Sequence, residues 1–159
     1  MKKLLLITII IIPIVFFVKK NIIDPSAIKS IQSDIFNMEQ QLINLVNMER
    51  TSHGMKPLKV DKKLSEIALI KSKDMKKNNY FSHISPTYGY FNEMLTYFGV
   101  SYQIAGENIA EGIYTPYEVV NIWMTSKLNR RNILKPEFTH TGVGYLEEGS
   151  VWTLLFIQK

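Results

Sequence analysis

The chain has 159 residues, 19 basic against 14 acidic side chains, a formal net charge of +5, and no cysteine. Four of the basic residues flank an apolar run near the N-terminus, so residues 21–159 hold 15 basic and 14 acidic side chains, a net charge of +1. Because the excess positive charge is confined to one end of the chain, it does not support the hypothesis of a nucleic-acid-binding protein, and we expect no nucleic-acid partner. The absence of cysteine excludes a disulfide framework, a thiolate metal site and a cysteine nucleophile.

The first 20 residues read MKKLLLITIIIIPIVFFVKK, in which residues 4–18 carry no charge. A positively charged start followed by an apolar run is the pattern of an export signal. A helix over the apolar run spans only about 22 Å, less than the roughly 30 Å of a hydrocarbon core. Flanking lysines can snorkel and a bilayer can thin, so the pattern fits both a cleaved signal peptide and an uncleaved signal anchor. We expect an extracytoplasmic protein, either secreted or tethered to the membrane through residues 4–18.

Residues 21–35 are interpreted as a spacer and residues 36–159 as one folded domain. Apolar residues at helical spacing predict a first helix over residues 36–50. Asp61 is a suitable N-cap for a second helix with an apolar stripe formed by Leu64, Ile67, Ala68 and Met75. The lysines of this helix are assigned to a solvated face: Lys62, Lys63, Lys71, Lys73, Lys76 and Lys77.

A third short helix is predicted around residues 91–98, ended by Gly99. Thr115, Pro116 and Glu118 form a strong helix start, and the fourth helix turns Val119, Val120 and Trp123 inward. Beyond Pro136 the apolar pattern changes to a period of two, which predicts a β-hairpin with strands over 141–146 and 151–157 joined by residues 147–150. Helices followed by antiparallel strands indicate an α+β fold.

The common catalytic templates are absent, because the sequence has no GxSxG, GxxxxGK[ST], GxGxxG or HExxH. Three histidines are available, and His53, in a polar turn, is expected to have no role. His83 lies between aromatic residues and Pro86 and is expected to be partly buried. Glu107 lies in a loop among small and apolar residues, where an unpaired charge would be costly. If His83 and Glu107 meet, a structural hydrogen-bonded pair is the favoured interpretation and a catalytic pair is the alternative.

Several segments carry, in chain order, a resemblance to a known family: Leu45–Arg50, Leu58–Asp61, Ala68 with Asp74–Met75, Tyr80–Pro86, Gly106–Ala110, Trp123–Ser126, Asn132–Leu134, Phe138, Gly142–Tyr145 and Trp152–Phe156. The ordered set resembles the CAP superfamily, named after cysteine-rich secretory proteins, antigen 5 and pathogenesis-related 1 proteins, in its bacterial YkwD-like, SCP-like extracellular branch. The resemblance implies an α-β-α sandwich with a small antiparallel sheet between helices, more short strands than the hairpin alone, export, and a surface cleft.

Many members of the superfamily line that cleft with two histidines and two acids, and some bind a divalent metal through the histidines. By position, His83 matches the first histidine and Glu107 the first acid, while Ser126 and Asn129 stand in the places of the second acid and the second histidine. An amide oxygen is a much poorer ligand for zinc than a neutral imidazole, so we predict no tight zinc site and no cofactor. His83 and His140 remain the weak candidates for a metal, with His140 as a replacement for the missing ligand.

The resemblance implies a non-enzymatic binding module that acts at the cell envelope or spore surface. Its cleft would take a lipid, a peptide or a cell-wall glycan, with polar contacts from His83, Glu107 and Asn129. One alternative is an envelope-acting hydrolase in which His83 is the base and Glu107 orients it, although the sequence identifies no nucleophile. Another is a wall-associated structural protein whose lysines between Lys62 and Lys77 touch an anionic polymer.

Overall fold

The computed structural model describes residues 24–159, so the expected export signal over residues 1–20 and its membrane segment, residues 4–18, lie outside the described residues. The helices are α1 (Pro25–Ser52), α2 (Lys62–Lys77), α3 (Phe91–Tyr97), α4 (Pro116–Thr125) and α5 (Lys127–Ile133). The strands are β1 (Lys59–Val60), β2 (Ile84–Ser85), β3 (Gly89–Tyr90), β4 (Ala105–Ala110), β5 (His140–Leu146) and β6 (Val151–Ile157). Within residues 24–159, no helix combines the length and the apolar character that crossing a bilayer requires.

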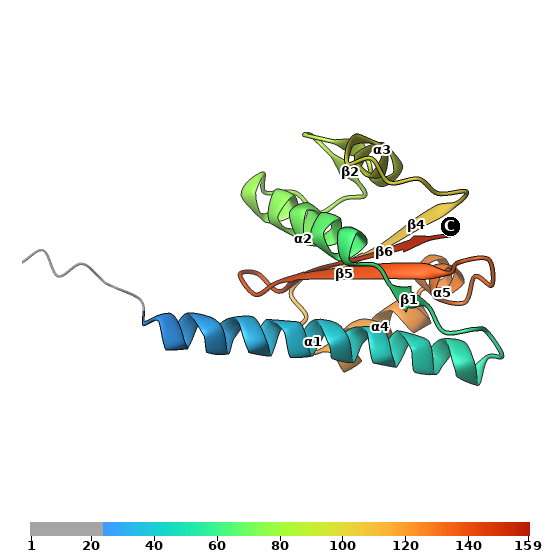
Figure 1. The fold of residues 1–159 in the computed structure, drawn as a ribbon, viewed down its shortest axis with the longest axis horizontal. Coiled ribbons are helices and arrows are strands. Elements are labelled where there is room, and N and C mark those ends of the chain that lie inside the picture. The colour runs from blue at the N-terminus through green and yellow to red at the C-terminus, as the bar shows by residue number, and fades with distance from the viewer. Residues whose placement is uncertain (1–23) are drawn as a thin grey trace, which may run out of the picture.

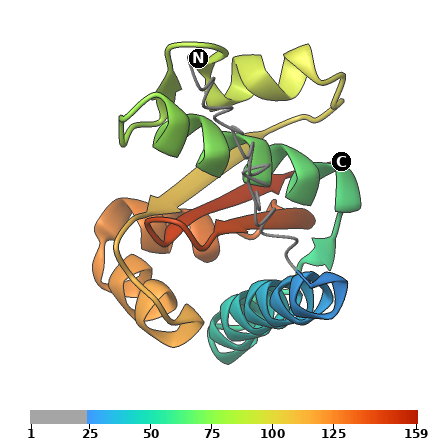
Figure 2. The same cartoon turned by 90° about the vertical axis from the view of Figure 1, so that its left-hand side faces the viewer.

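The central layer is a four-stranded sheet in the order β1-β5-β6-β4, in which β1 runs parallel to β5 and the other neighbours are antiparallel. In Figure 1 and Figure 2, α1, α4 and α5 lie against one face of this sheet and α2 and α3 against the other. This three-layer arrangement confirms the expected α-β-α sandwich and the α+β class. A separate two-stranded ribbon, β2 with β3, lies between α2 and α3 in the chain.

The alternation of side chains along β6 builds the core on both faces of the sheet. Leu154 and Phe156 pack with α1, α4 and α5, together with Trp123. Leu155 and Ile157 point the other way and pack with α2 and α3. Because both faces are covered by helices, every residue of β6 is buried, which explains why this strand reads as a continuous apolar run.

The predicted elements of the domain are confirmed at α2, α3, α4 and the β5–β6 hairpin, whose connection is residues 147–150 as expected. Asp61 caps α2 by accepting a hydrogen bond from the Leu64 backbone N–H at 3.0 Å. Two glycines of β5 allow α2 to lie directly on the strand, because a Cβ at Gly142 or Gly144 would collide with the backbone of α2. The Gly-Val-Gly pattern is therefore a packing requirement of this helix–sheet contact.

Three expectations differ from the structure. The first helix begins at Pro25 and not at Phe36, so most of the expected spacer, residues 21–35, is helical. Asp24 caps this helix, Pro25 occupies its first turn, and no helix-breaking residue follows before Phe36. Glu107 lies on a strand and not in a loop, because β4 pairs along its whole length with β6. Lys71 is 1% exposed and does not belong to a solvated lysine face.

Candidate functional site

The candidate site is built around a hydrogen bond between His83 and Glu107. His83 Nδ1 lies 2.7 Å from Glu107 Oε1, so the pair that the sequence proposed conditionally does form. The side chain of Glu107 is 0% exposed and that of His83 is 50% exposed, so half of the His83 side chain is buried. A buried carboxylate thus holds an imidazole whose other side is open to solvent.

The position of Glu107 follows from its place near the middle of β4, where it pairs with Leu155 of β6. Helix α5 is attached to the same part of β4 through Asn108 and Asn132. Asn132 of α5 donates hydrogen bonds to the Glu107 carbonyl at 3.0 Å and to Asn108 Oδ1 at 2.9 Å. Asn108 in turn donates to the carbonyl of Asn129 at 3.2 Å. The first turns of α5 are therefore held beside the strand that carries Glu107.

Ser126 and Asn129, the two remaining residues that the sequence assigned to the cleft, lie on those first turns of α5. Ser126 is the N-cap residue, and its carbonyl accepts a hydrogen bond from the Arg130 backbone N–H at 2.8 Å. Both residues are partly exposed. The main chain of Asn129 is bound to β4, so the structure brings Asn129 next to the strand of Glu107, whereas Ser126 lies one turn earlier.

The loop that carries His83 is fixed by Asp74 of α2, whose only sequence signal is its place in the family resemblance. Its carboxylate accepts hydrogen bonds from Ser85 Oγ at 2.7 Å, Thr87 Oγ1 at 2.8 Å and Asn78 Nδ2 at 2.7 Å, and from the Tyr80 hydroxyl. Burial tends to raise the pKa of Asp74, but the hydrogen bonds outweigh it and hold the pKa below its usual value. Asp74 is therefore an ionised anchor for the residues on both sides of His83.

Glu107 has a different environment from Asp74. Burial raises the pKa of Glu107, an effect that the hydrogen bond from His83 and the charges of Lys71 and His83 partly offset. Its second oxygen, Oε2, is buried and has no hydrogen-bond partner among the described residues. Lys71 is the nearby cation, and its Nζ donates to the Tyr80 hydroxyl at 3.2 Å. Helical spacing could have revealed Lys71, because it falls on the stripe of Leu64, Ile67 and Met75.

The other two histidines do not join this site. His140 begins β5, which is separated from β4 by β6, and its Nδ1 contacts Thr139 Oγ1 at 2.8 Å. Burial lowers the pKa of His140, with further effects from Lys159, Asp61 and Lys59. A cavity of about 560 Å³ near these residues is lined by Asp61, Lys63 and Lys159, and it belongs to this end of the sheet and not to His83. Within residues 24–159, no group of three or more histidines and acids could hold a metal ion.

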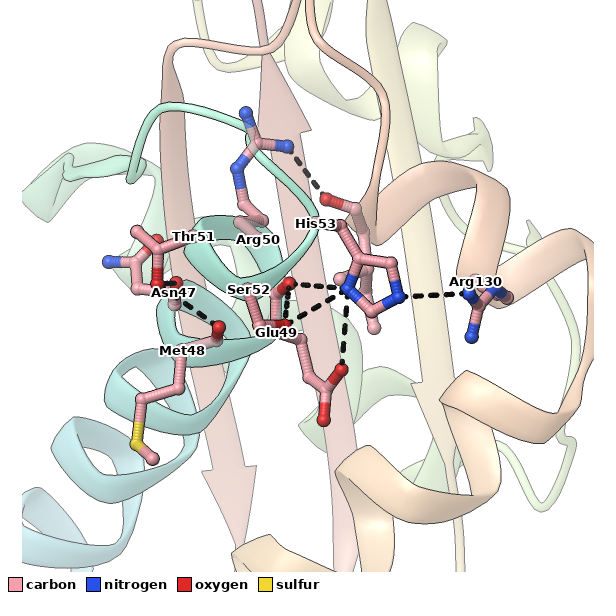
Figure 3. A network of polar contacts seen from close by, with 9 residues as sticks. Asn47, Met48, Glu49, Arg50, Thr51, Ser52, His53 and Arg130 are labelled. Atoms are coloured by element: carbon pink, nitrogen blue, oxygen red, sulfur yellow. Dashed lines mark hydrogen bonds and ion pairs between the residues drawn. The ribbon is translucent and has the colours of Figure 1, made fainter.

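His53, for which no role was expected, connects α1 to α5, as Figure 3 shows. Arg130 Nη2 lies 3.0 Å from His53 Nε2, and His53 Nδ1 lies 2.8 Å from the Glu49 carbonyl. Because a guanidinium can only donate, Nε2 is the acceptor and the proton of the neutral ring is on Nδ1. This contact fixes the residue next to Asn129, so His53 has a structural part in holding α5.

Arg50 is the second connection between α1 and the α5 region, and Figure 3 shows its guanidinium directed toward a main-chain oxygen. It is 0% exposed and donates to four carbonyls: Lys56 at 2.8 Å, Ile133 at 2.7 Å, Lys135 at 2.9 Å and Phe138 at 3.2 Å. Arg50 belongs to one of the family segments and falls on the helical stripe of Ile43 and Val46, so its spacing could have revealed its burial, whereas its four carbonyl partners have no sequence signal. Arg50 thus fixes the path from α5 to β5.

Comparisons with known proteins agree with this architecture. The model of the cysteine-rich secretory protein (CAP) family matches residues 43–159. The uncharacterized protein YkwD of Bacillus subtilis (strain 168) is 53% identical over 130 residues, which are 82% of this chain and 51% of YkwD. The uncharacterized membrane protein YlbC of the same organism is 38% identical over 76% of this chain and 34% of YlbC. The chain therefore spans about half the length of the first relative and about a third of the second.

Among solved structures, an extracellular protein of Bacillus anthracis str. Ames that contains an SCP domain superposes with a TM-score of 0.77 at 37% identity, covering 85% of this chain and 44% of that one. A cysteine-rich secretory protein of Staphylococcus aureus superposes with a TM-score of 0.68 at 21% identity, covering 77% of this chain and 38% of that one, which supports the fold alone.

Proposed function

The chain belongs to the cysteine-rich secretory protein (CAP) family, and from this premise we propose that it is an exported binding module of the bacterial cell envelope or spore surface. Its ligand, a lipid, a peptide or a cell-wall glycan, is held at the His83 site and is not chemically changed. The extracellular SCP-domain relative and the relative that is named a membrane protein support an extracytoplasmic location. The charged and apolar pattern of residues 1–20 supports export and a membrane tether.

The observation that carries this proposal is the half-exposed imidazole of His83 on a fully buried carboxylate. The 2.7 Å hydrogen bond fixes the ring before a ligand arrives, so less conformational freedom is lost on binding. Asp74 fixes the flanking loop through Ser85 and Thr87. A rigid polar group at a surface is suited to orient a ligand.

The hydroxyls close to His83 in the chain favour binding over hydrolysis. Ser85 Oγ donates to Asp74 at 2.7 Å, and the Tyr80 hydroxyl also donates to Asp74. Ser82 Oγ accepts from the Ile84 backbone N–H at 3.1 Å and shapes the turn. These hydroxyls serve the loop, and none of them is hydrogen-bonded to His83 as an activated nucleophile would be.

Binding is tested with the full-length chain in detergent micelles and with soluble muropeptides and phospholipid vesicles as probes. We expect one probe to bind, and we expect His83→Gln to weaken that binding about tenfold, the effect of losing one hydrogen bond to a polar group. His140→Gln is the matched control, because it changes a partly buried histidine on β5 that has no hydrogen bond to Glu107. Equal affinity of His83→Gln and the wild type would refute the proposal. Release of new soluble fragments that is lost in both His83→Gln and Glu107→Gln would establish the hydrolase instead.

The tether is tested separately by expressing the full chain in a Gram-positive host and identifying its N-terminus by mass spectrometry. We expect cell-associated protein that retains residues 1–20. A chain that accumulates in the medium and begins beyond residue 20 would refute the tether and leave a secreted binding module.

A further inference from the structure

The outer edge of β5 is open over most of its length. β1 pairs only with residues 140–141 of β5, and the strand continues for five more residues. Thr141 directs its carbonyl toward β1, where it accepts a hydrogen bond from the Asp61 backbone N–H at 2.8 Å. Because main-chain groups alternate along a strand, Val143 and Tyr145 direct their N–H and C=O groups to the same side as Thr141. Within residues 24–159, no strand pairs with them on that side.

A single side chain occupies part of this open edge. Glu39 of α1 accepts a hydrogen bond from the Tyr145 backbone N–H at 2.9 Å, in the place where a neighbouring strand would present a carbonyl. A charged side chain at a sheet edge is one of the devices by which proteins prevent uncontrolled strand pairing. Val143 has no such substitute among the described residues, so its main-chain groups are available to a partner.

The open edge is the floor of a groove between α1 and α2, and Figure 1 shows β5 between these two helices. A cavity of about 510 Å³ is lined by Phe36 and Glu39 of α1, Leu69 of α2 and Val143. A second cavity, of about 470 Å³, shares Phe36, Glu39 and Leu69 with the first and reaches Tyr145. The first cavity also borders β1, so the two together form one groove, the β5 groove, that continues the line of β1 along the edge of the sheet.

The walls of the β5 groove combine apolar surface with an excess of negative charge. Phe36 on one wall is 63% exposed, and Leu69 lines the other wall. The lining of the two cavities carries four carboxylates and two lysines, a net charge of −2. Glu66 is paired with Lys62 at 4.0 Å, whereas Glu39 has no ion pair among residues 24–159. The groove therefore complements a segment that carries both apolar and basic side chains.

We propose that the β5 groove binds an extended, basic segment of another protein, which adds to β5 as a further strand. The five residues of β5 beyond β1 set the length of the paired segment, about 17 Å of extended chain. In strand addition the main-chain hydrogen bonds supply affinity and alternate side chains supply specificity. Here an apolar side chain of the segment packs on Phe36, and a lysine or arginine pairs with Glu39. The groove is separate from the His83 site, because β6 lies between β5 and β4.

Binding is tested with the full-length chain in phospholipid nanodiscs and a capped five-residue peptide in which valine and arginine alternate. We expect Glu39→Gln to weaken binding about tenfold, because the ion pair is lost while the amide oxygen can still accept from Tyr145. Glu49→Gln is the matched control, since Glu49 is a partly exposed glutamate of the same helix outside the groove. Phe36→Ala should also lose about tenfold, with Met48→Ala, a change of an equally exposed residue on α1, as its control.

Three outcomes of this measurement overturn the proposal. The first is no binding of the arginine peptide at about 1 mM, which is weaker than a specific docking site allows. The second is equal binding of a peptide with glutamate in place of arginine. The third is equal affinity of Glu39→Gln and the wild type for the arginine peptide.

Hydrogen exchange of the main-chain amides tests whether the bound peptide is a strand. We expect the Val143 amide to exchange at least about tenfold more slowly when the peptide is bound, since a strand hydrogen bond protects it. A peptide with a central proline, which lacks one N–H, should bind more weakly. An unchanged exchange rate of Val143 with bound peptide overturns strand addition. Self-association of the full-length chain in sedimentation, weakened in Glu39→Gln and Phe36→Ala, would assign the groove to a second copy of this chain and overturn the proposed partner.

Discussion

Replacing Arg50 is expected to destabilise the whole domain, because this side chain holds together segments that are far apart in the chain. Its guanidinium is 0% exposed, and its bonds to the carbonyls of Ile133 and Phe138 span 83 and 88 residues of sequence. The described residues offer it no ion pair with a carboxylate, so main-chain oxygens alone solvate the charge. Arg50→Met keeps much of the apolar stem and removes all of these hydrogen bonds.

The magnitude follows from the four carbonyl contacts. A hydrogen bond to a charged group contributes about 1.5–3 kcal/mol, which would give more than about 6 kcal/mol if the contributions added. They do not add, because the four bonds share one group and because removing the charge also removes the cost of burying it. We therefore expect Arg50→Met to lose about 3–5 kcal/mol of unfolding free energy. For a domain of this size the melting temperature then falls by about 10–15 °C. Arg50→Lys keeps the charge but not the planar fork, and it should lose about 2–3 kcal/mol.

The assay is thermal and urea unfolding of the full-length chain, followed by circular dichroism and tryptophan fluorescence. Arg131→Met is the matched control, since Arg131 is exposed on α5 and should change stability by less than about 0.5 kcal/mol. A loss below about 1 kcal/mol in Arg50→Met, or equal stability of Arg50→Lys and the wild type, would refute the claim that the four hydrogen bonds of the Arg50 guanidinium stabilise the connection from α5 to β5.

Two further predictions concern packing and acid stability. Gly144→Ala should lose about 2–3 kcal/mol of unfolding free energy, because its Cβ would meet the backbone of Leu69. Gly54→Ala, at a position with open space but a φ of +77°, should lose about 1 kcal/mol. Equal losses in thermal unfolding would contradict the close packing of α2 on β5. Asp74 has a folded-state pKa below the unfolded value of 3.8, so its contribution is complete above that value and is lost as the pH falls through the folded pKa. Asp74→Asn should therefore reduce the loss of unfolding free energy between about pH 4 and pH 2, measured by urea unfolding at each pH. If the variant loses as much unfolding free energy over this range as the wild type, Asp74 is not the group responsible.

The elements that the sequence predicted best are those with a local signal. Asp61 before α2 and Thr115 before α4 are N-caps whose side chains accept the expected backbone hydrogen bonds. The start of α1 also has a local signal, Asp24 followed by Pro25, but residues 25–34 are exposed and show no core-facing pattern. β4 has no local signal, because Ala-Gly-Glu-Asn-Ile-Ala has little strand propensity. It becomes a strand by pairing with β6, a contact between residues about 50 apart in the chain.

The candidate site likewise contains residues that the sequence indicated and residues that it did not. The environment of Glu107 marked it as a residue in need of a partner, and His83 was available, yet only the fold brings the two within 2.7 Å. The burial of Lys71 could be read from helical spacing, but six lysines along one helix favour a solvated face by composition. The four carbonyl contacts of Arg50 come from turns whose geometry has no sequence pattern. The charged groups that organise the site were therefore the hardest to predict.

The way α5 is held shows that the fold does not depend on the side chain at position 129. The contact of Asn129 with β4 runs through its main-chain carbonyl, which accepts from Asn108. The helix is fixed by its neighbours, since Asn132 binds β4 and Arg130 binds His53. None of these bonds depends on the side chain at position 129. A substitution there would change the chemistry of the site while the framework stays in place.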